Sequence, residues 1–456
     1  MKEKIYLFLP HFIQNLLITL FDYLAYRKRH GGVYNRYKKY FKKAEMLTLE
    51  ELQEEQEKRL SDFIRNVYHD STFYQELWKN VKDVDLNNIT LKDLSKLPLV
   101  SKEDIRKNID KICVNKSKKI VSHTGGTTGK SLTVYFSKEN AQERFACLDN
   151  FKNRFEWKFG DKTAWFSGKN ILNRRDIKKN RYWKTDMLYN IRYYSTFHIS
   201  EKTAEFYIND FNKYQPIFFS GFPSSITEIA KIGIKKSMKL DYQVKGIFPT
   251  AESITDEDKA VMKKFYGCEI YDQYASSEGA PFITQCKNGH MHLEMLTGVF
   301  EILDDNGKTS DSGELIVTAF ATEATPLIRY RIEDSIELET KPISCENKAP
   351  VVKKIHGRIN DFIYSEERGK INLGNVSNIV KYVKGVVQFQ FIQNSKELIE
   401  VLIVKDDTYK QEDENMLVKE LRDRLGKHVK IEFKYVSTIF REKSGKYRIV
   451  KNNLKI

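Results

Sequence analysis

The sequence predicts an α/β protein in which a large N-terminal mixed α/β domain, with sheets and a barrel-like part, precedes a small C-terminal α+β domain. Between about residues 120 and 335, short apolar runs alternate with helical patterns, which indicates a substantial mixed sheet. Residues 298–340 change to strands interrupted by turn signals at 304–307 and 311–313, which favours antiparallel or barrel-like structure. After Lys353 the pattern indicates a separate unit of about 100 residues, a common domain size.

Periodicity predicts the individual elements within this plan. Residues 49–68 have helical spacing, and Ser101 with Asp104 forms an N-cap pattern. Further strands are predicted over 133–136, 216–220, 245–249 and 269–271, and further helices over 200–213, 224–236 and 255–265. In the C-terminal part, strands are predicted over 388–393, 399–404 and 429–435, and a helix over 412–425. The predicted domains are 1–355 and 356–456.

A segment near the N-terminus, residues 5–26, is nearly long enough to span a bilayer. Its polar residues count against a span, and these are Pro10, His11, Gln14, Asn15 and Asp22. From Phe12 onward the apolar residues recur at one-and-four spacing, so an amphipathic helix is predicted, with basic residues beginning at Arg27 after it. Two alternatives stay open: the apolar face packs on the body of the protein, or it docks on an anionic membrane.

The net charge and the cysteines indicate which partners and which cell compartment to expect. Lysine and arginine outnumber aspartate and glutamate by 77 to 62 in 456 residues, and the formal net charge of +15 favours polyanionic partners. Nucleic acid is not expected, because no basic motif is interleaved with aromatic residues. The five cysteines form no CxxC pair, and no small-residue cleavage site follows the apolar segment. We therefore expect a cytoplasmic protein, either free or peripheral on the inner face of the cell membrane.

The stretch SHTGGTTGKS at 122–131 is the first candidate site. Because Gly125, Gly126 and Gly129 lack Cβ atoms, their backbone N–H groups can approach phosphate oxygens closely. The side chains that add further donors are those of Thr124, Thr127, Thr128 and Lys130. The spacing differs from that of the Walker P-loop. A phosphate-binding loop is predicted, with an ordinary glycine turn as the alternative.

Further stretches carry side chains that suit a nucleotide. Glu278 follows a predicted strand and offers a carboxylate for Mg²⁺ on a triphosphate. Asp334 can accept hydrogen bonds from ribose hydroxyls. Arg358 stands at the start of the small domain in Gly357-Arg358-Ile359-Asn360-Asp361, and Lys446 stands near its end in Ser444-Gly445-Lys446. Each of these residues alone is more often a solvated surface charge, so the interpretation depends on their order along the chain.

In this order, the stretches resemble motifs of the adenylate-forming superfamily of acyl-CoA synthetases and ligases, and within it the phenylacetate-CoA ligase-like branch. The similarity is greatest to members of that branch associated with capsular polysaccharide biosynthesis. It covers most of the chain, and further segments that carry it are 9–17, 73–74, 97–102, 220–225, 250–253 and 388–393. The resemblance implies that ATP, with Mg²⁺, and a carboxylate form an acyl-adenylate and pyrophosphate, and that an acceptor then displaces AMP.

The resemblance also implies a role for each candidate residue. The 124–130 loop holds the β- and γ-phosphates, Lys130 assists departure of pyrophosphate, and Glu278 binds Mg²⁺. Asp334 binds the ribose, and Arg358 contacts the nucleotide. Lys446 stabilises charge at the α-phosphate from a mobile small domain that rotates between the two steps. The residues implied to flank the adenine are Thr250, Ala251, Glu252, Ser253, Tyr271, Asp272, Gln273 and Tyr274.

Three further stretches concern the substrates and the hinge between the domains. Residues 196–199 resemble the segment that gates the acyl pocket in related ligases, so His198 is a candidate gate, with a packed core histidine as the alternative. Asn360 occupies the hinge position two residues after Arg358, so the residue about which the small domain would rotate is not predicted. The charged stretch 364–372 stands where CoA ligases of this branch have a glycine-containing loop that opens the pantetheine route. An acceptor other than CoA is therefore favoured, and the use of CoA stays open.

A candidate zinc site consists of Cys286, His290, His292 and Cys345, because thiolates and neutral imidazoles suit Zn²⁺. The resemblance leads us to expect a further cysteine where Ile343 stands. This missing ligand counts against Zn²⁺. In the alternative, the cysteines are ordinary thiols.

Three functions are compatible with these features. The favoured one is an AMP-forming ligase that activates a small-molecule carboxylate and transfers it to a sugar or amine in capsular or other surface polysaccharide biosynthesis. The second makes a CoA thioester. The third is a membrane-associated scaffold without catalysis, against which the joint presence of Lys130, Glu278, Asp334 and Lys446 counts. Neither the carboxylate nor the acceptor is predicted, because pocket shape depends on side chains from distant segments.

Overall fold

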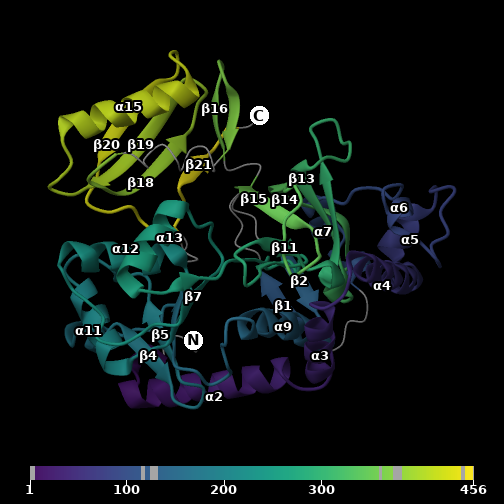
Figure 1. Cartoon of the computed structure of the whole chain (residues 1–456), viewed down its shortest axis with the longest axis horizontal. Coiled ribbons are helices and arrows are strands. Elements are labelled where there is room, and N and C mark those ends of the chain that lie inside the picture. The colour runs from purple at the N-terminus through teal and green to yellow at the C-terminus, as the bar shows by residue number, and fades with distance from the viewer. Residues whose placement is uncertain are drawn as a thin grey trace.

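The computed structural model describes residues 6–113, 119–123, 132–358, 362–372, 383–442 and 447–454, with the backbone alone described at Arg358, Lys370, Asn372 and Arg424. Figure 1 shows a large part that contains two main sheets and a smaller part at the C-terminal end, in which one helix lies across a sheet. The predicted α/β fold, with a large mixed part followed by a small α+β part, is confirmed.

Helices precede the first strands of the chain. The predicted helix at 49–68 is α4 (Leu49–Asp70), which starts at a capping box between Thr48 and Glu51 and buries an apolar stripe. The predicted cap at Ser101 also forms a capping box with Asp104. The other helices of this region are α2 (His11–Arg29), α3 (Tyr34–Ala44), α5 (Thr72–Trp78), α6 (Leu91–Leu94), α7 (Lys102–Lys107) and α8 (Ile109–Ile112).

The predicted N-terminal amphipathic helix is present, and its orientation shows that one of the two predicted alternatives is wrong. It begins after Pro10 and continues through the basic residues to Arg29. Its apolar side chains face outward, with Phe12 70% and Phe21 60% exposed, whereas Gln14 is buried. The alternative in which the apolar face packs on the protein is therefore wrong, because the polar face makes that contact. In the part of the chain that the structure describes, every helix is too short or too polar to cross a membrane.

Six strands form a mostly parallel sheet in the order β4-β5-β3-β6-β7-β8, with β4 antiparallel to β5 at one edge. The predicted alternation of strands and helices is confirmed here. The strands are β3 (Thr163–Ser167), β4 (Trp183–Asp186), β5 (Ile191–Ser195), β6 (Phe218–Gly221), β7 (Gly246–Pro249) and β8 (Glu269–Ile270). The helices of this region are α9 (Lys138–Asn153), α10 (Arg174–Lys178), α11 (Ala204–Tyr214), α12 (Pro223–Lys235) and α13 (Asp256–Tyr266).

The carboxyl ends of β3, β5, β6 and β7 lie at one edge of this sheet because the four strands are parallel. The backbones of β3 and β6 pass very closely there. Gly221, at φ 120°, ends β6, and a Cβ atom at this position would lie 1.9 Å from the carbonyl oxygen of Phe166 in β3. Glycine is therefore required at this point. The segments that follow the four strands are brought together by this shared edge.

Seven strands form a second, antiparallel sheet in the order β12-β13-β14-β15-β11-β10-β9. The predicted turn at 304–307 joins β12 to β13. These strands are β9 (Gln273–Tyr274), β10 (Ile283–Gln285), β11 (Met291–Leu293), β12 (Gly298–Leu303), β13 (Ser312–Ala319), β14 (Leu327–Leu338) and β15 (Val351–Arg358). Two 3₁₀ turns, η1 (Met295–Thr297) and η2 (Phe320–Thr322), and an antiparallel pair, β1 (Ile120–His123) with β2 (Thr133–Phe136), complete the large part.

The small part is a four-stranded sheet in the order β20-β19-β18-β21 with a separate hairpin. The predicted strand pair 388–393 and 399–404, the helix at 412–425 and the strand at 429–435 are confirmed. The elements are β16 (Phe362–Ser365), β17 (Gly369–Asn372), β18 (Val386–Gln393), β19 (Leu398–Lys405), α15 (Gln411–Leu425), β20 (Lys430–Tyr435) and β21 (Val450–Asn452). The predicted boundary at 355/356 falls within β15, which belongs to the large antiparallel sheet, so the boundary itself stays a prediction.

Candidate nucleotide site

The carboxyl edge of the parallel sheet carries three of the predicted stretches. His198 follows β5, Ser224 follows β6 at the start of α12, and Glu252 follows β7. In open α/β sheets, ligands bind outside the carboxyl ends of the strands, where neighbouring connections leave in opposite directions. This edge is therefore the candidate site.

His198 is held against the body of the protein. Its Nδ1 atom lies 2.8 Å from Ser195 Oγ, and its carbonyl oxygen accepts a hydrogen bond from the Thr203 hydroxyl at 2.5 Å. Burial lowers the pKa of the imidazole, which favours the neutral form at pH 7. The structure thus gives His198 a defined position beside the site, and its function as a gate stays a prediction.

Tyr274 and Asp334, predicted to contact adenine and ribose, lie side by side. The Tyr274 hydroxyl donates a hydrogen bond to Asp334 Oδ2 at 2.6 Å, although three strands separate β9 from β14 in the sheet. Asp334 also pairs in register with Arg358, whose side chain lies outside the described residues. Residues predicted to contact one nucleoside therefore meet from distant parts of the sequence.

A β-bulge in β14 directs Asp334. Arg331 pairs with Ile316 and Ser335 pairs with Glu314, so β14 advances four residues while β13 advances two. Glu333, within this interval, has a φ of 66°, a conformation that non-glycine residues seldom adopt. Bulges of this kind change the direction of a side chain next to functional sites.

The rest of the predicted adenine stretch is engaged in other contacts. The ring of Tyr271 stacks on Phe155, with 3.8 Å between ring centroids and 14° between the planes. Asp272 accepts a hydrogen bond from the Gln273 backbone N–H at 2.9 Å and lies 3.3 Å from Lys259 Nζ. Of this stretch, Tyr274 is the residue whose side chain bonds to Asp334. Adenine contacts for Tyr271, Asp272 and Gln273 stay predictions.

Glu278, the predicted Mg²⁺ ligand, is a buried carboxylate next to a cation. Lys102 Nζ lies 3.9 Å from Glu278 Oε1, and the Arg144 guanidinium donates hydrogen bonds to the carbonyls of Gly279 and Ala280 at 2.6 and 2.9 Å. Burial lowers the pKa of Arg144 to about 10, so it stays charged at pH 7. A carboxylate of this kind, joined by substrate phosphates, suits Mg²⁺, which prefers oxygen ligands.

The predicted phosphate-binding residues, Thr124, Gly125, Gly126, Thr127, Thr128, Gly129 and Lys130, lie outside the described residues, as does Lys446. Both ends of the phosphate loop are described. His123 of β1 pairs with Thr133 of β2, and the Ser122 hydroxyl donates a hydrogen bond to the carbonyl of Ser277 at 3.0 Å. The strand that leads into the loop therefore ends beside the residue that precedes Glu278.

A group of five residues joins the candidate site to the small domain, and we call it the interdomain cluster: Ser224, Glu228, Glu252, Arg441 and Tyr447. Glu252 accepts hydrogen bonds from the backbone N–H of Ser224 at 3.1 Å and from that of Tyr447 at 2.8 Å. Arg441 Nη2 lies 3.2 Å from Glu228 and Nη1 lies 3.9 Å from Glu252. Because Tyr447 directly follows Lys446, Glu252 holds the chain next to the predicted catalytic lysine.

Glu252 therefore has a contact that the sequence did not predict. Ala251, its neighbour, is exposed and has a φ of 70°, a strained conformation for alanine. This turn separates two of the residues predicted to flank the adenine: Ala251 is exposed, and the Glu252 carboxylate points into the interdomain cluster. Burial raises the pKa values of Glu228 and Glu252, although Arg441 acts in the opposite direction.

Three of the four zinc candidates come together. The Sγ atoms of Cys286 and Cys345 are 3.4 Å apart, and Cys345 Sγ lies 3.4 Å from His292 Nε2. A tetrahedral Zn²⁺ site requires ligand separations of about 3.3 to 3.8 Å, as follows from its bond lengths, so these residues fit the ion. The described part of the chain contains this one group of metal-binding type. The His290 side chain is not in it, and the His290 carbonyl accepts a hydrogen bond from the Cys286 backbone N–H.

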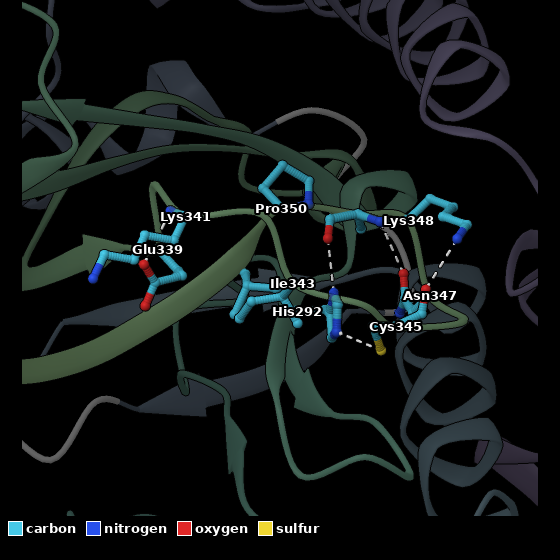
Figure 2. A pocket seen from close by; sticks show the side chains of 10 residues that line it. His292, Glu339, Lys341, Ile343, Cys345, Asn347, Lys348 and Pro350 are labelled. Carbon is cyan, nitrogen blue, oxygen red and sulfur yellow. Dashed lines mark hydrogen bonds between the residues drawn. The ribbon is translucent and has the colours of Figure 1, made fainter.

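The surroundings of the cluster orient His292. Figure 2 shows its ring between Cys345 and the segment that contains Pro350. The Nδ1 atom lies 2.7 Å from the carbonyl oxygen of Ala349 and so donates to it, which leaves the Nε2 lone pair facing the thiols. Ile343, which occupies the expected cysteine position, lines an adjoining cavity of about 200 Å³.

Comparison with known proteins identifies the family. Residues 363–453 match the family model described as the CapK C-terminal domain. The whole chain is 34% identical over 460 residues to Protein CapK of Staphylococcus aureus, and the alignment covers 100% of each chain. The chain belongs to the CapK family.

Solved structures show the fold of this CapK-family chain. It superimposes with a TM-score of 0.72 on 2-hydroxyisobutyryl-CoA ligase in the postadenylation state, at 15% identity, covering 90% of this chain and 91% of the ligase. The same ligase in the thioesterification state, with CoA bound, gives a TM-score of 0.58 at 16% identity, again covering 90% and 91%. The CapK-family chain therefore has the fold of a two-domain adenylate-forming ligase.

Several residues of this CapK-family site were missed from the sequence. Lys102 and Arg144 support the Glu278 segment, and Glu228 and Arg441 belong to the interdomain cluster. Lys102 stood within one of the segments that carry the family resemblance, so a signal was present for it. The other three are single charged residues on helices or loops, and such residues have no distinguishing pattern in a sequence.

Proposed function

We propose that this chain is an ATP-dependent, AMP-forming ligase that activates a carboxylate as an acyl-adenylate and then transfers the acyl group to an acceptor. The observation that carries the proposal is the hydrogen bond between Tyr274 and Asp334. Gln273, next to Tyr274, contacts the carbonyl oxygen of Pro249 at the end of β7, and Glu252, which follows β7, binds the backbone N–H of Tyr447. Support comes from the fold, since the 2-hydroxyisobutyryl-CoA ligase that shares it was solved with an acyl-adenylate bound.

In the first half-reaction, a carboxylate oxygen of the substrate attacks the α-phosphorus of ATP. The bond to the bridging oxygen of the β-phosphate breaks, and pyrophosphate leaves with the electron pair. Asp334 and Tyr274 hold the nucleoside, and Glu278 provides a ligand for Mg²⁺, which when bound supplies positive charge to the phosphate oxygens. Lys446 stabilises the charge that develops at the α-phosphate, from the segment that Glu252 holds through Tyr447.

In the second half-reaction, a nucleophile attacks the acyl carbon, AMP leaves, and the nucleophile loses its proton. The small domain rotates between the half-reactions, which requires the interdomain cluster to separate. We propose that the acceptor is a sugar or amine in the assembly of capsular or another surface polysaccharide. The charged stretch 364–372, which includes the exposed Glu366, Glu367 and Arg368, supports an acceptor other than CoA.

Pyrophosphate exchange into ATP tests this proposal. The exchange is measured across a panel of carboxylates, and product formation is measured with CoA, amino sugars and amino acids in turn. We expect carboxylate-dependent exchange, and thioester formation with CoA would establish the second candidate function instead. Absence of carboxylate-dependent exchange across the panel contradicts the adenylation proposal and favours a non-catalytic scaffold.

Lys446→Ala tests the assigned catalytic lysine, with Lys443→Ala in the same segment as the matched control. We expect exchange to fall by about a hundredfold or more in Lys446→Ala, because a charge-stabilising group at a phosphoryl centre contributes several kcal/mol. ATP binding should be retained in both variants. Equal exchange in the two variants contradicts the assignment.

We also propose that Cys286, His292 and Cys345 hold Zn²⁺, with a fourth ligand from outside these three residues. The ion would join the hairpin of β10 and β11 to the segment around Cys345, which is a structural role. Metal analysis of the purified protein should find about one zinc per chain, lost in Cys345→Ser and retained in the control Cys268→Ser. Wild-type protein purified without chelators that contains no zinc contradicts the proposal.

A further inference from the structure

Helix α2 packs on the protein through its polar face. His11, Asn15, Thr19 and Asp22 recur every three or four residues, so they lie on one side of the helix. Each of these side chains contacts the large domain: His11 at α10, Asn15 at β4, Thr19 at the residue after β4, and Asp22 at β5. Globular proteins ordinarily bury the apolar stripe of such a helix. Here the arrangement is reversed.

The exposed edge of the parallel sheet explains the reversal. β4 is the edge strand, so backbone N–H groups on its outer side need acceptors. Asn15 Oδ1 accepts from the N–H of Thr185 at 3.2 Å, and Thr19 Oγ1 accepts from the N–H of Met187 at 3.0 Å. Four residues of helix advance about 6 Å, and two residues of strand advance about 6.6 Å. The polar side chains of α2 therefore match the hydrogen-bonding period of the strand.

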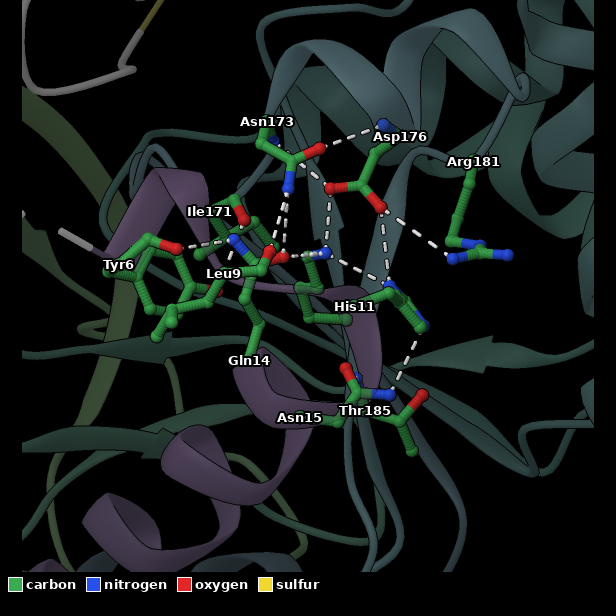
Figure 3. A network of polar contacts seen from close by, with 11 residues as sticks. Tyr6, Leu9, His11, Gln14, Asn15, Ile171, Asn173, Asp176, Arg181 and Thr185 are labelled. Atoms are coloured by element: carbon green, nitrogen blue, oxygen red, sulfur yellow. Dashed lines mark hydrogen bonds and ion pairs between the residues drawn. The ribbon is translucent and has the colours of Figure 1, made fainter. Parts of the chain in front are cut away.

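A buried polar group, the docking network, holds the N-terminal turn of α2 and consists of His11, Gln14, Asn173, Asp176 and Lys184. Figure 3 shows His11, Gln14, Asn173 and Asp176 of this network, together with Asn15 and Thr185, between α2 and the α10 region. Lys184 is fully buried, and its Nζ lies 2.7 Å from Asp176 Oδ2 and 2.9 Å from His11 Nδ1. Rotating α2 to bury its apolar face would remove His11 and Gln14 from Lys184 and leave the buried ammonium with Asp176 as its remaining partner in this network. The orientation of α2 is therefore set by the fold.

The consequence is a continuous set of exposed apolar side chains along the outer side of α2, which lies along the lower edge of the molecule in Figure 1. The tip of the hairpin between β4 and β5 extends the set, because Met187 is hydrogen-bonded to Thr19 and is 57% exposed. We call these residues the apolar face, and they are Phe8, Phe12, Leu16, Leu17, Leu20, Phe21, Leu24, Met187 and Leu188. Contiguous apolar surface of this kind marks an interaction site.

Basic residues lie near both ends of α2. Residues 6–44 contain eight lysines and arginines but one acidic residue, Asp22, which accepts a hydrogen bond from Tyr193. At the other end of α2, the exposed residues of α10 and the turn after it include four bases, while Asp176 is buried. We call these exposed bases the basic rim, and they are Arg27, Lys28, Arg29, Arg36, Lys39, Lys42, Lys43, Arg174, Arg175, Lys178 and Lys179.

We propose that the apolar face of α2 inserts into the headgroup region of a bilayer that contains anionic lipids, with the basic rim on the lipid phosphates. Apolar side chains at the level of the acyl boundary with basic residues beside them are the features of interfacial helices. A second copy of this chain fits less well, because pairing two apolar faces would bring two basic rims together and produce repulsion. The proposal is independent of the ligase reaction.

Vesicle sedimentation tests this proposal with the full chain. The probes are vesicles of phosphatidylcholine alone and of phosphatidylcholine with phosphatidylglycerol. We expect sedimentation with the anionic vesicles that weakens as salt is added, because salt screens the basic rim. The triple variant Phe12→Gln, Leu16→Gln, Leu20→Gln should bind at least roughly tenfold more weakly, since each substitution removes an apolar side chain from the contact.

Met416→Gln is the matched control, since Met416 is 42% exposed on α15 in the small domain. It should bind vesicles as the wild type does. The triple variant should keep its thermal unfolding temperature and its pyrophosphate exchange, which separates this proposal from the proposed function. Equal vesicle binding by the triple variant and the wild type, or no binding to the anionic vesicles, overturns the proposal. So does a wild-type dimer in light scattering that the triple variant converts to a monomer without any vesicle binding.

Discussion

Two buried groups of charged residues hold distant segments together in this protein, and they are balanced differently. In the docking network, Asp176 contacts Lys184 at 2.7 Å and His11 at 3.2 Å. In the interdomain cluster, the carboxylates of Glu228 and Glu252 both face Arg441, at 3.2 and 3.9 Å. In the first group one carboxylate faces two basic side chains, whereas in the second two carboxylates share one guanidinium, and Glu252 accepts its hydrogen bonds from backbone N–H groups.

The pKa values show the result of this difference. Burial alone would raise the pKa of Asp176, but hydrogen bonds from His11 and Lys184 outweigh it and lower the value to about 2. For Glu228 and Glu252 burial remains the larger effect, and their pKa values are raised. A buried ion pair stabilises a structure only where its partners compensate the loss of hydration. The docking network suits a permanent contact, and the interdomain cluster suits one that separates, as the proposed rotation of the small domain requires.

The largest expected effect comes from Asp176→Asn, which removes the carboxylate of the docking network and leaves Lys184 buried without an anion. The free energy of unfolding should fall by about 3 kcal/mol, as for other broken buried pairs. Urea unfolding followed by circular dichroism measures it. Asp305→Asn, in the exposed turn after β12, is the control and should change little. If the free energy of unfolding falls by less than about 1 kcal/mol, the partners in the docking network do not compensate the burial of its charges as we infer.

The pH dependence of the same pair of proteins sharpens this result. Because the pKa of Asp176 is lowered from 3.8 to about 2 in the folded protein, its contribution is complete above about pH 4 and is lost as the pH falls toward 2. The difference in unfolding free energy between wild type and Asp176→Asn should therefore be constant from pH 7 to about pH 4 and shrink below it. A difference that grows on acidification contradicts the lowered pKa.

Glu252→Ala tests the interdomain cluster and should act on the reaction more than on stability. Without the carboxylate, the backbone N–H groups of Ser224 and Tyr447 lose their acceptor, and the segment next to Lys446 is no longer held. Pyrophosphate exchange should slow by about tenfold to a hundredfold, the equivalent of one or two hydrogen bonds to a charged group. Glu54→Ala, at an exposed position of α4, is the control. Unchanged exchange in Glu252→Ala would show that Tyr447 is positioned by other contacts.

The smallest effect is expected for Glu228→Gln, the counterpart of Asp176→Asn in the interdomain cluster. The raised pKa means that burial already disfavours the ionised form, so replacing it with a neutral amide should change the free energy of unfolding by less than about 1 kcal/mol. Chemical unfolding under the same conditions gives the value. If Glu228→Gln destabilises the protein as much as Asp176→Asn, the contrast between the two groups is wrong.

Much of the fold followed from the sequence because it depends on local patterns. The helix at 49–68, the cap at Ser101 and the strand pair at 388–393 and 399–404 are each specified by spacing, capping residues or turns within one segment. Less of the candidate site could be predicted from the sequence. The order of motifs indicated Tyr274, Glu278 and Asp334, but not which of their neighbours would face them.

The sequence by itself determined which segments are helices and strands, that α2 is amphipathic, and that a set of nucleotide-binding motifs occurs in order. Only the tertiary structure decided which face of α2 is buried, because that depends on the N–H groups of Thr185 and Met187 at a sheet edge some 170 residues away. It likewise decided that Glu252 binds the backbone of Tyr447. The physical reason is the same in both cases: a polar group is satisfied by whatever partner the fold brings within hydrogen-bonding distance, and a local pattern does not contain that partner.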